Sequence, residues 1–80
     1  FLTKAGPNVY DFIYVDASHE PVDVLRDAMG SFDTLKPNGL MLFDDYGWKD
    51  CHHGIDAFLH AYYKKINIHV KGYQVLVEKV

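Results

Sequence analysis

The chain has 80 residues, a formal net charge of −3 and 49% hydrophobic residues. That length allows one small domain or part of a larger one, and the hydrophobic content excludes a disordered chain. The basic residues are scattered, so we expect no nucleic-acid partner. No apolar stretch is long enough to span a bilayer, no signal peptide is recognisable, and a single cysteine excludes an internal disulfide. These features favour a cytoplasmic protein without a membrane partner.

The first half of the chain predicts a strand followed by a helix. Residues 9–16 are rich in β-branched and aromatic side chains and follow a Gly-Pro-Asn breaker, which is typical of a strand. Pro21 suits the first position of a helix. Apolar residues then recur at three- and four-residue spacing, which predicts an amphipathic helix that buries this stripe: Val22, Leu25, Met29, Phe32 and Leu35.

The next segments predict a second strand and a second helix. A turn at residues 36–39 is expected to end the first helix, and residues 40–44 form a short apolar strand. After a polar loop, the second helix is expected to begin at Asp50 or Cys51. Its buried stripe has five members: Ile55, Phe58, Leu59, Tyr62 and Ile66.

The end of the chain predicts a β-hairpin. Residues 66–70 and 73–80 alternate in polarity around the turn residues Lys71 and Gly72. The order is therefore strand, helix, strand, helix, strand, strand. This order predicts an α/β fold with right-handed crossovers, a parallel sheet and an antiparallel hairpin at its edge.

The two predicted parallel strands carry apolar residues on both faces, which is typical of strands covered on both sides. The two helices follow similar crossovers and are expected to cover one face only. The other face would need more chain or a partner to cover it. We therefore expect residues 1–80 to form a single partial domain, completed by a missing N-terminal half or by an oligomeric partner.

Three carboxylates are expected at one edge of this sheet. Asp16 ends the first parallel strand, and Asp44 and Asp45 end the second, where open α/β sheets bind ligands. Clustered carboxylates repel one another unless a cation neutralises them, and hard oxygen ligands favour Mg²⁺ or Ca²⁺. Alternatively, Asp45 starts a turn and Asp16 caps the following segment.

Histidines and aromatic residues follow the same strands. His19 lies in the loop after the first strand, where it suits either a general base or a loop residue that helps to start the helix. Cys51, His52 and His53 are consecutive, and consecutive residues rarely bind one metal ion together, so we expect no zinc site. Two loop aromatics either wall a substrate pocket or pack on the sheet: Tyr46 and Trp48.

Several motifs in this order resemble class I S-adenosylmethionine-dependent methyltransferases. Residues 10–19 (YDFIYVDASH) resemble the fourth strand and following loop, in the form DFIxIDGxH of small-molecule O-methyltransferases. Residues 35–46 (LKPNGLMLFDDY) resemble the LLKPGGxxxxDDY segment around the fifth strand, and residues 54–58 (GIDAF) resemble the start of the next helix. The final hairpin is similar to the two strands that end this fold. The resemblance implies the C-terminal half of a Rossmann-like methyltransferase sheet.

The chain departs from the family pattern at several points. Ala17 replaces a usual glycine, and Asn38 replaces the first glycine of the turn, where asparagine tolerates a left-handed backbone. The Gly-rich loop that cradles the methionine end of the cofactor and the acidic residue that binds its ribose belong to the first two strands of the family fold. Neither has a counterpart in these 80 residues.

The resemblance also implies roles for individual residues. Asp16, Asp44 and Asp45 correspond to the divalent-metal ligands of metal-dependent members, with Mg²⁺ as the expected ion. His19 matches the base of the Asp-x-x-His motif in macrocin-type sugar O-methyltransferases. Asp16 and Ala17 would provide the remaining contacts to S-adenosylmethionine.

The expected function is methyl transfer to a hydroxyl of a small molecule, assisted by the metal, in the full-length parent. A second interpretation is a non-catalytic half-domain that assembles with itself or another chain. A third is a metal-independent methyltransferase whose carboxylates only bind substrate. The substrate class stays open among sugars, phenols and polyketide alcohols.

Overall fold

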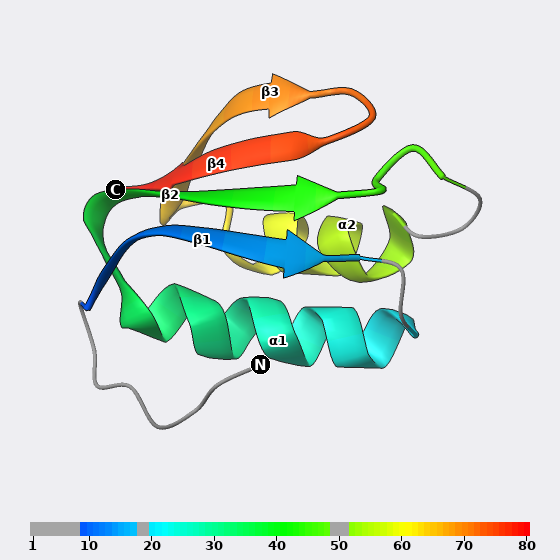
Figure 1. Cartoon of the computed structure of the whole chain (residues 1–80), viewed down its shortest axis with the longest axis horizontal. Helices are drawn as coiled ribbons and strands as arrows, with labels where there is room; N and C mark the ends of the chain where they lie inside the picture. Colours follow the sequence, from blue (N-terminus) through cyan, green and yellow to red (C-terminus); the bar gives the residue numbers. More distant parts are fainter. Residues whose placement is uncertain (1–8, 18–19, 49–51) are drawn as a thin grey trace.

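The computed structural model of the chain describes residues 9–17, 20–48 and 52–80. Within these residues, four strands form one sheet and two helices pack on it (Figure 1). The mixed α/β class predicted from the sequence is confirmed. In chain order the elements are β1 (Tyr10–Asp16), α1 (Pro21–Thr34), β2 (Leu35–Asp44), α2 (His52–Ala61), β3 (Ile66–Lys71) and β4 (Val75–Lys79).

The sheet has the strand order β1-β2-β4-β3. β1 and β2 are parallel and are connected through α1, whereas β4 is antiparallel to both of its neighbours, β2 and β3. Figure 1 shows β1 and β2 pointing the same way, with the turn between β3 and β4 at the end where both of them finish. This end is the carboxyl edge of the sheet, where ligands bind in open α/β folds.

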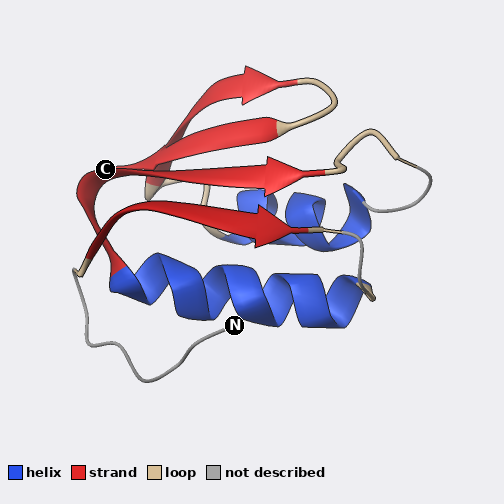
Figure 2. Cartoon of the chain, in the orientation of Figure 1, coloured by secondary structure: helices blue, strands red, loops and turns tan. Residues whose placement is uncertain are grey.

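Both helices cover the same face of the sheet (Figure 2). Alternate residues of three strands point to that face and are buried: Ile13, Val15, Met41, Phe43, Val75 and Val77. They form one core with the buried residues of α1 and α2. Ring contacts extend this core across both helices, with centroids 5.8 Å apart for Phe32 and Phe58 and 5.5 Å apart for Phe43 and Phe58.

The opposite face of the sheet has no helix over it among the described residues. Phe12 and Tyr14 are 52% and 51% exposed there, and their register partners Leu40 and Leu42 are only partly buried. Leu76, opposite Leu42 on β4, continues the same apolar surface. We call this surface the open sheet face.

The turn predicted at residues 36–39 lies inside a strand rather than before one. β2 begins at Leu35, which pairs with Tyr10, and the next pair joins Leu40 to Phe12. The residues between these pairs leave the ladder as a bulge, and Asn38 takes a left-handed backbone with φ of 69°. The predicted start of this strand at residue 40 was therefore wrong. β2 pairs with β1 both before the turn, at Leu35, and after it, from Leu40 onward.

The predicted buried stripe of α1 was also partly wrong. Val22 and Met29 are 61% and 43% exposed, whereas Val24 and Ala28 are fully buried together with Phe32. Two apolar stripes run along this helix, and spacing alone does not decide between them. The stripe with the small residue Ala28 faces the sheet and α2, because a small side chain allows closer packing. Leu35 is buried as predicted, but in an extended conformation after the helix.

The second helix and the hairpin agree more closely with the prediction. Ile55, Phe58 and Leu59 are buried on α2, and Tyr62 packs against the core just after the helix. Ile66 is buried as predicted, but it is the first residue of β3, because α2 ends at Ala61. The predicted helix start at Asp50 or Cys51 lies outside the described residues. β3 and β4 form the expected antiparallel hairpin, with residues 72–74 as its turn. No helix in the described part of the chain has the length and apolar character needed to cross a membrane.

Candidate functional site at the carboxyl edge of the sheet

The ends of β1 and β2 bring the three predicted aspartates to one edge. Asp16 and Asp44 are register partners on neighbouring parallel strands. Asp45 follows directly, and its backbone has a left-handed φ of 60°, which turns the chain away from the strand direction. Asp16 is exposed, and Asp44 and Asp45 are partly buried. We call this group the acidic rim.

Tyr14 contacts the acidic rim at Asp44. Its hydroxyl donates a hydrogen bond to Oδ2 of Asp44 at 2.5 Å. This bond, followed by burial and the charges of Asp44, Asp16 and Asp45, raises the pKa of Tyr14 to about 12. The hydroxyl therefore stays protonated at neutral pH and acts as a donor, and all three carboxylates lie close enough to act on it.

Asp44 also accepts hydrogen bonds at its other oxygen. The side-chain amide of Gln74 and the backbone N–H of Asp45 donate to Oδ1 of Asp44 at 3.0 and 2.9 Å. The bond from Tyr14, then those from Gln74 and the Asp45 backbone, hold the pKa of Asp44 below its usual value. Asp44 is therefore ionised at neutral pH.

The turn between β3 and β4 closes over the acidic rim. The hydroxyl of Tyr73 donates to Oδ1 of Asp45 at 2.9 Å, and the backbone N–H of Gly47 donates to the carbonyl of Tyr73 at 3.1 Å. A Cβ at Gly47 would lie 3.1 Å from the Tyr73 ring, so a glycine suits this close approach. The hairpin turn is thereby fixed to the loop that follows β2.

A second polar group lies beside the rim, at the start of α2. Tyr46 donates from its hydroxyl to Oδ1 of Asp56 at 2.7 Å, and Nδ1 of His52 lies 2.9 Å from Oδ2 of the same carboxylate. The Tyr46 and His52 rings are 5.9 Å apart, and the ammonium of Lys71 lies 5.6 Å from the Tyr46 ring centre. We call these four residues the His52 cluster.

The electrostatics of this cluster keep its carboxylate charged. Burial acts to raise the pKa of Asp56, but hydrogen bonds from Tyr46 and His52 and the charges of His52 and Lys71 outweigh it and lower the pKa. The bond to Asp56, then burial and the Asp56 charge, raise the pKa of Tyr46 to about 12. Asp56 is therefore an anion and Tyr46 a neutral donor at neutral pH.

The remaining predicted site residues are placed as follows. Ala17 is fully buried in the core directly after β1. His19 and Cys51 lie outside the described residues. Tyr46 packs against the core while its hydroxyl stays with Asp56, and Trp48 is 44% exposed.

A magnesium site was predicted at Asp16, Asp44 and Asp45, and their oxygen atoms are of the hard type that Mg²⁺ prefers. In residues 9–17, 20–48 and 52–80, no three His, Cys, Asp or Glu side chains are placed to hold a metal ion together. Asp44 turns to Tyr14 and Gln74, and Asp45 turns to Tyr73. The magnesium site stays a prediction.

Sequence reasoning missed three residues that donate hydrogen bonds to the rim: Tyr14, Tyr73 and Gln74. Tyr14 lies two residues before Asp16 on the same face of β1, so strand periodicity contained a signal for it. Tyr73 and Gln74 reach the rim only because β4 pairs with β2, and the sequence contains no local signal for that pairing.

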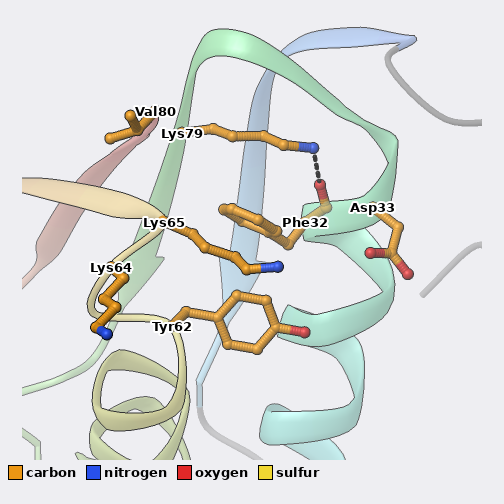
Figure 3. A pocket seen from close by; sticks show the side chains of 7 residues that line it. All are labelled: Phe32, Asp33, Tyr62, Lys64, Lys65, Lys79 and Val80. Carbon is orange, nitrogen blue, oxygen red and sulfur yellow. Dashed lines mark hydrogen bonds between the residues drawn. The ribbon is translucent and has the colours of Figure 1, made fainter.

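A different hollow lies at the opposite end of the sheet (Figure 3). Its volume is about 380 Å³, and it is lined by Phe32, Asp33, Tyr62, Lys64, Lys65, Lys79 and Val80. The ammonium of Lys79 donates to the carbonyls of Phe32 and Leu35 at 3.0 and 2.8 Å and lies 4.7 Å from the Phe32 ring centre. Because α1 has no basic residue in its last turn, Lys79 supplies the positive charge at that helix end.

A sequence match covers the segment that contains the three aspartates of the rim. A family model described as a methyltransferase domain matches residues 1–46, which is more than half of the chain. The chain therefore belongs to this methyltransferase-domain family. The matched segment includes β1, α1, β2 and the three aspartates of the acidic rim. No curated protein matches the chain.

Proposed function

We propose that this chain takes part in S-adenosylmethionine-dependent methyl transfer to a hydroxyl of a small molecule. The observation that supports this most directly is the acidic rim, with Tyr14, at the carboxyl edge of β1 and β2 in a chain of the methyltransferase-domain family. Carboxylates at this edge accept hydrogen bonds from substrate hydroxyls and can fix their orientation.

The reaction forms a bond between the acceptor oxygen and the methyl carbon. The carbon–sulfur bond breaks, its electron pair stays on sulfur, and the acceptor hydroxyl loses its proton. The cofactor supplies the activated methyl group. In the proposal, Asp44 and Asp45 orient the acceptor, and His19 takes the proton, as the family resemblance implies.

The residues for the cofactor are Asp16 and Ala17 in this proposal. Asp16 suits a contact with a polar ligand because its carboxylate is exposed at the carboxyl edge. Ala17 is fully buried in the core, so its contact with the cofactor stays a prediction from the family resemblance. A Gly-rich loop has no counterpart in these 80 residues. We therefore propose that another segment completes the cofactor site and covers the open sheet face, as in a Rossmann-like methyltransferase sheet.

Activity tests the orienting role. In the protein that carries this chain, transfer of a labelled methyl group to a panel of hydroxyl acceptors is measured for the wild type, Asp44→Asn and Asp33→Asn. Asp33 is an exposed aspartate at the opposite end of the sheet and serves as the matched control. We expect Asp44→Asn to lower turnover about 100-fold, because the acceptor loses its orientation, and the control to stay within about twofold. Equal activity of all three proteins would contradict the proposal.

Metal assistance is tested separately, and no step above depends on it. Turnover is measured after treatment with EDTA and again after MgCl₂ is added. Loss that Mg²⁺ restores, and that Asp45→Ala abolishes, would assign the rim carboxylates to a metal ion. Turnover that survives chelation would assign them to substrate hydroxyls alone.

A second candidate function is a non-catalytic assembly module. It is favoured by the half-exposed Phe12 and Tyr14 of the open sheet face and by Val22 and Met29 on the outer side of α1. Calorimetry with S-adenosylmethionine distinguishes the two functions. Cofactor binding by the completed protein supports the enzyme, and an assembly that never binds cofactor supports the module. The predicted cytoplasmic location stays a prediction.

A further inference from the structure

The His52 cluster contains a histidine–carboxylate pair that the proposed mechanism does not use. His52 and Asp56 lie one turn apart on α2, with Nδ1 of His52 2.9 Å from Oδ2 of Asp56. Their side chains are 37% and 44% exposed. The pair is therefore accessible at the surface but held in one orientation.

The contact fixes the tautomer of His52. An ionised carboxylate only accepts hydrogen bonds, so Nδ1 of His52 must carry a proton and donate it to Asp56. In the neutral imidazole, Nε2 then has the lone pair and is an acceptor. Tyr46 fixes the carboxylate from the other side, because its hydroxyl donates to Oδ1 of Asp56.

The position of the cluster links it to the acidic rim. Tyr46 follows Asp45 directly in the chain, and the left-handed backbone of Asp45 sends the two side chains to different partners, Tyr73 and Asp56. Lys71, at the end of β3, adds an ammonium donor near the Tyr46 ring. A hydrogen-bond acceptor and a donor are thus available beside the rim.

We propose that His52 is a specificity-determining residue whose Nε2 accepts a hydrogen bond from a second hydroxyl of the acceptor substrate, with Asp56 as its positioning residue. The same hydroxyl donates its hydrogen to Nε2 of His52 and accepts a hydrogen bond from the Lys71 ammonium, so it matches both groups. The opposite charges of Asp56 and Lys71 offset one another here, so an uncharged group suits this place. The preferred acceptor is therefore a neutral diol, one hydroxyl lying at the rim and the other at His52. This inference rests on the proposed function.

Nitrogen NMR tests the positioning step without any activity. In the full protein, we expect His52 to show the Nδ1–H tautomer in the wild type and in Tyr46→Phe, which keeps the contact with Asp56. Asp56→Ala should shift His52 toward the Nε2–H tautomer that free histidine prefers. An Nε2–H tautomer in the wild type would overturn the proposal.

Probe binding tests the subsite itself. Vicinal cyclohexanediol and cyclohexanol are titrated against the wild type, and the Nε2 signal of His52 is followed. We expect a saturable shift with the diol and none with the single alcohol. His52→Phe should weaken diol binding about tenfold, the effect of losing one hydrogen bond. His60→Phe, at an exposed histidine of the same helix, should leave it unchanged.

The outcomes separate this inference from the proposed function. A diol-specific shift that His52→Phe removes supports the subsite, even if no methyl transfer is ever detected. Equal shifts with both probes, no shift with the diol, or unaltered diol binding in His52→Phe would each overturn the subsite, even if methyl transfer is found. The NMR of the wild type stays decisive if His52→Phe does not fold.

Discussion

The first turns of α1 and α2 meet at Gly54, which makes the substitution Gly54→Ala a sharp test of the packing. A Cβ at Gly54 would lie 2.5 Å from the carbonyl oxygen of Pro21 and 2.9 Å from Cβ of Val24. Neither atom can move by a side-chain rotation, so the two helices must separate. Gly54→Ala should therefore weaken the packing between the first turns of α1 and α2.

The expected change in the free energy of unfolding follows from two opposing effects. Overpacking of this kind costs about 1–3 kcal/mol, and alanine gains about 1 kcal/mol over glycine within a helix. We expect a net loss of about 1–2 kcal/mol in the free energy of unfolding, since one of the two contacts is with backbone. For a chain of this size, the midpoint of thermal unfolding should fall by roughly 4–16 °C.

Gly30→Ala is the matched control. Gly30 also lies within a helix, but a Cβ there would meet no atom within 4 Å. This variant should gain about 1 kcal/mol from helix propensity alone, so the two variants should differ by about 2–3 kcal/mol. Urea unfolding followed by circular dichroism measures both. Equal stability of Gly54→Ala and Gly30→Ala would contradict the close approach of the two helices at Gly54.

Three further outcomes follow from contacts elsewhere in the fold. Lys79→Met should lower the free energy of unfolding, measured by urea unfolding, by about 1–2 kcal/mol, because two charged hydrogen bonds at the end of α1 are lost. The control Lys64→Met, at an exposed lysine, should change this free energy by less than about 0.5 kcal/mol. Ser31→Ala should raise the free energy of unfolding by about 1 kcal/mol, since Oγ of Ser31 is buried and finds no hydrogen-bond partner among the described residues. A lower free energy of unfolding in this variant would contradict the expectation. Tyr46 should titrate near pH 12 by ultraviolet absorbance. Because the pKa of Tyr46 in the folded protein lies above the unfolded value of 10.0, its stabilising contribution is complete below pH 10 and is lost as the pH rises toward 12. Tyr46→Phe should therefore lose less free energy of unfolding than the wild type between pH 10 and 12. An equal loss in both proteins would refute the contact with Asp56.

Much of the fold follows from local sequence patterns. The alternating strands and helices, the presence of a terminal hairpin, and the one-sided cover of the sheet all follow from periodicity and turn chemistry. The edge shared by Asp16, Asp44 and Asp45 follows from the rule that parallel strands end at the same side.

What the sequence did not reveal depends on packing between distant segments. Val22 and Val24 begin two competing stripes on α1, and only contact with the sheet and α2 decides which is buried. Asn38 marks a turn, but whether β2 also pairs on the N-terminal side of that turn depends on the position of β1. Gln74 reaches Asp44 through the antiparallel pairing of β2 with β4, which no local pattern encodes.

The mixed pairing of β2 has a consequence for the order of folding. The β3–β4 hairpin closes through residues 72–74 alone, so it should form within microseconds. The parallel pairing of β1 with β2 must wait for the whole α1 crossover, because a long loop has to close before its contacts form. Asp16 therefore meets Asp44 only after the hairpin has formed. In pulsed hydrogen exchange, the amides of β4 that face β3 should gain protection before those of β1, so that the acidic rim takes shape only after the hairpin.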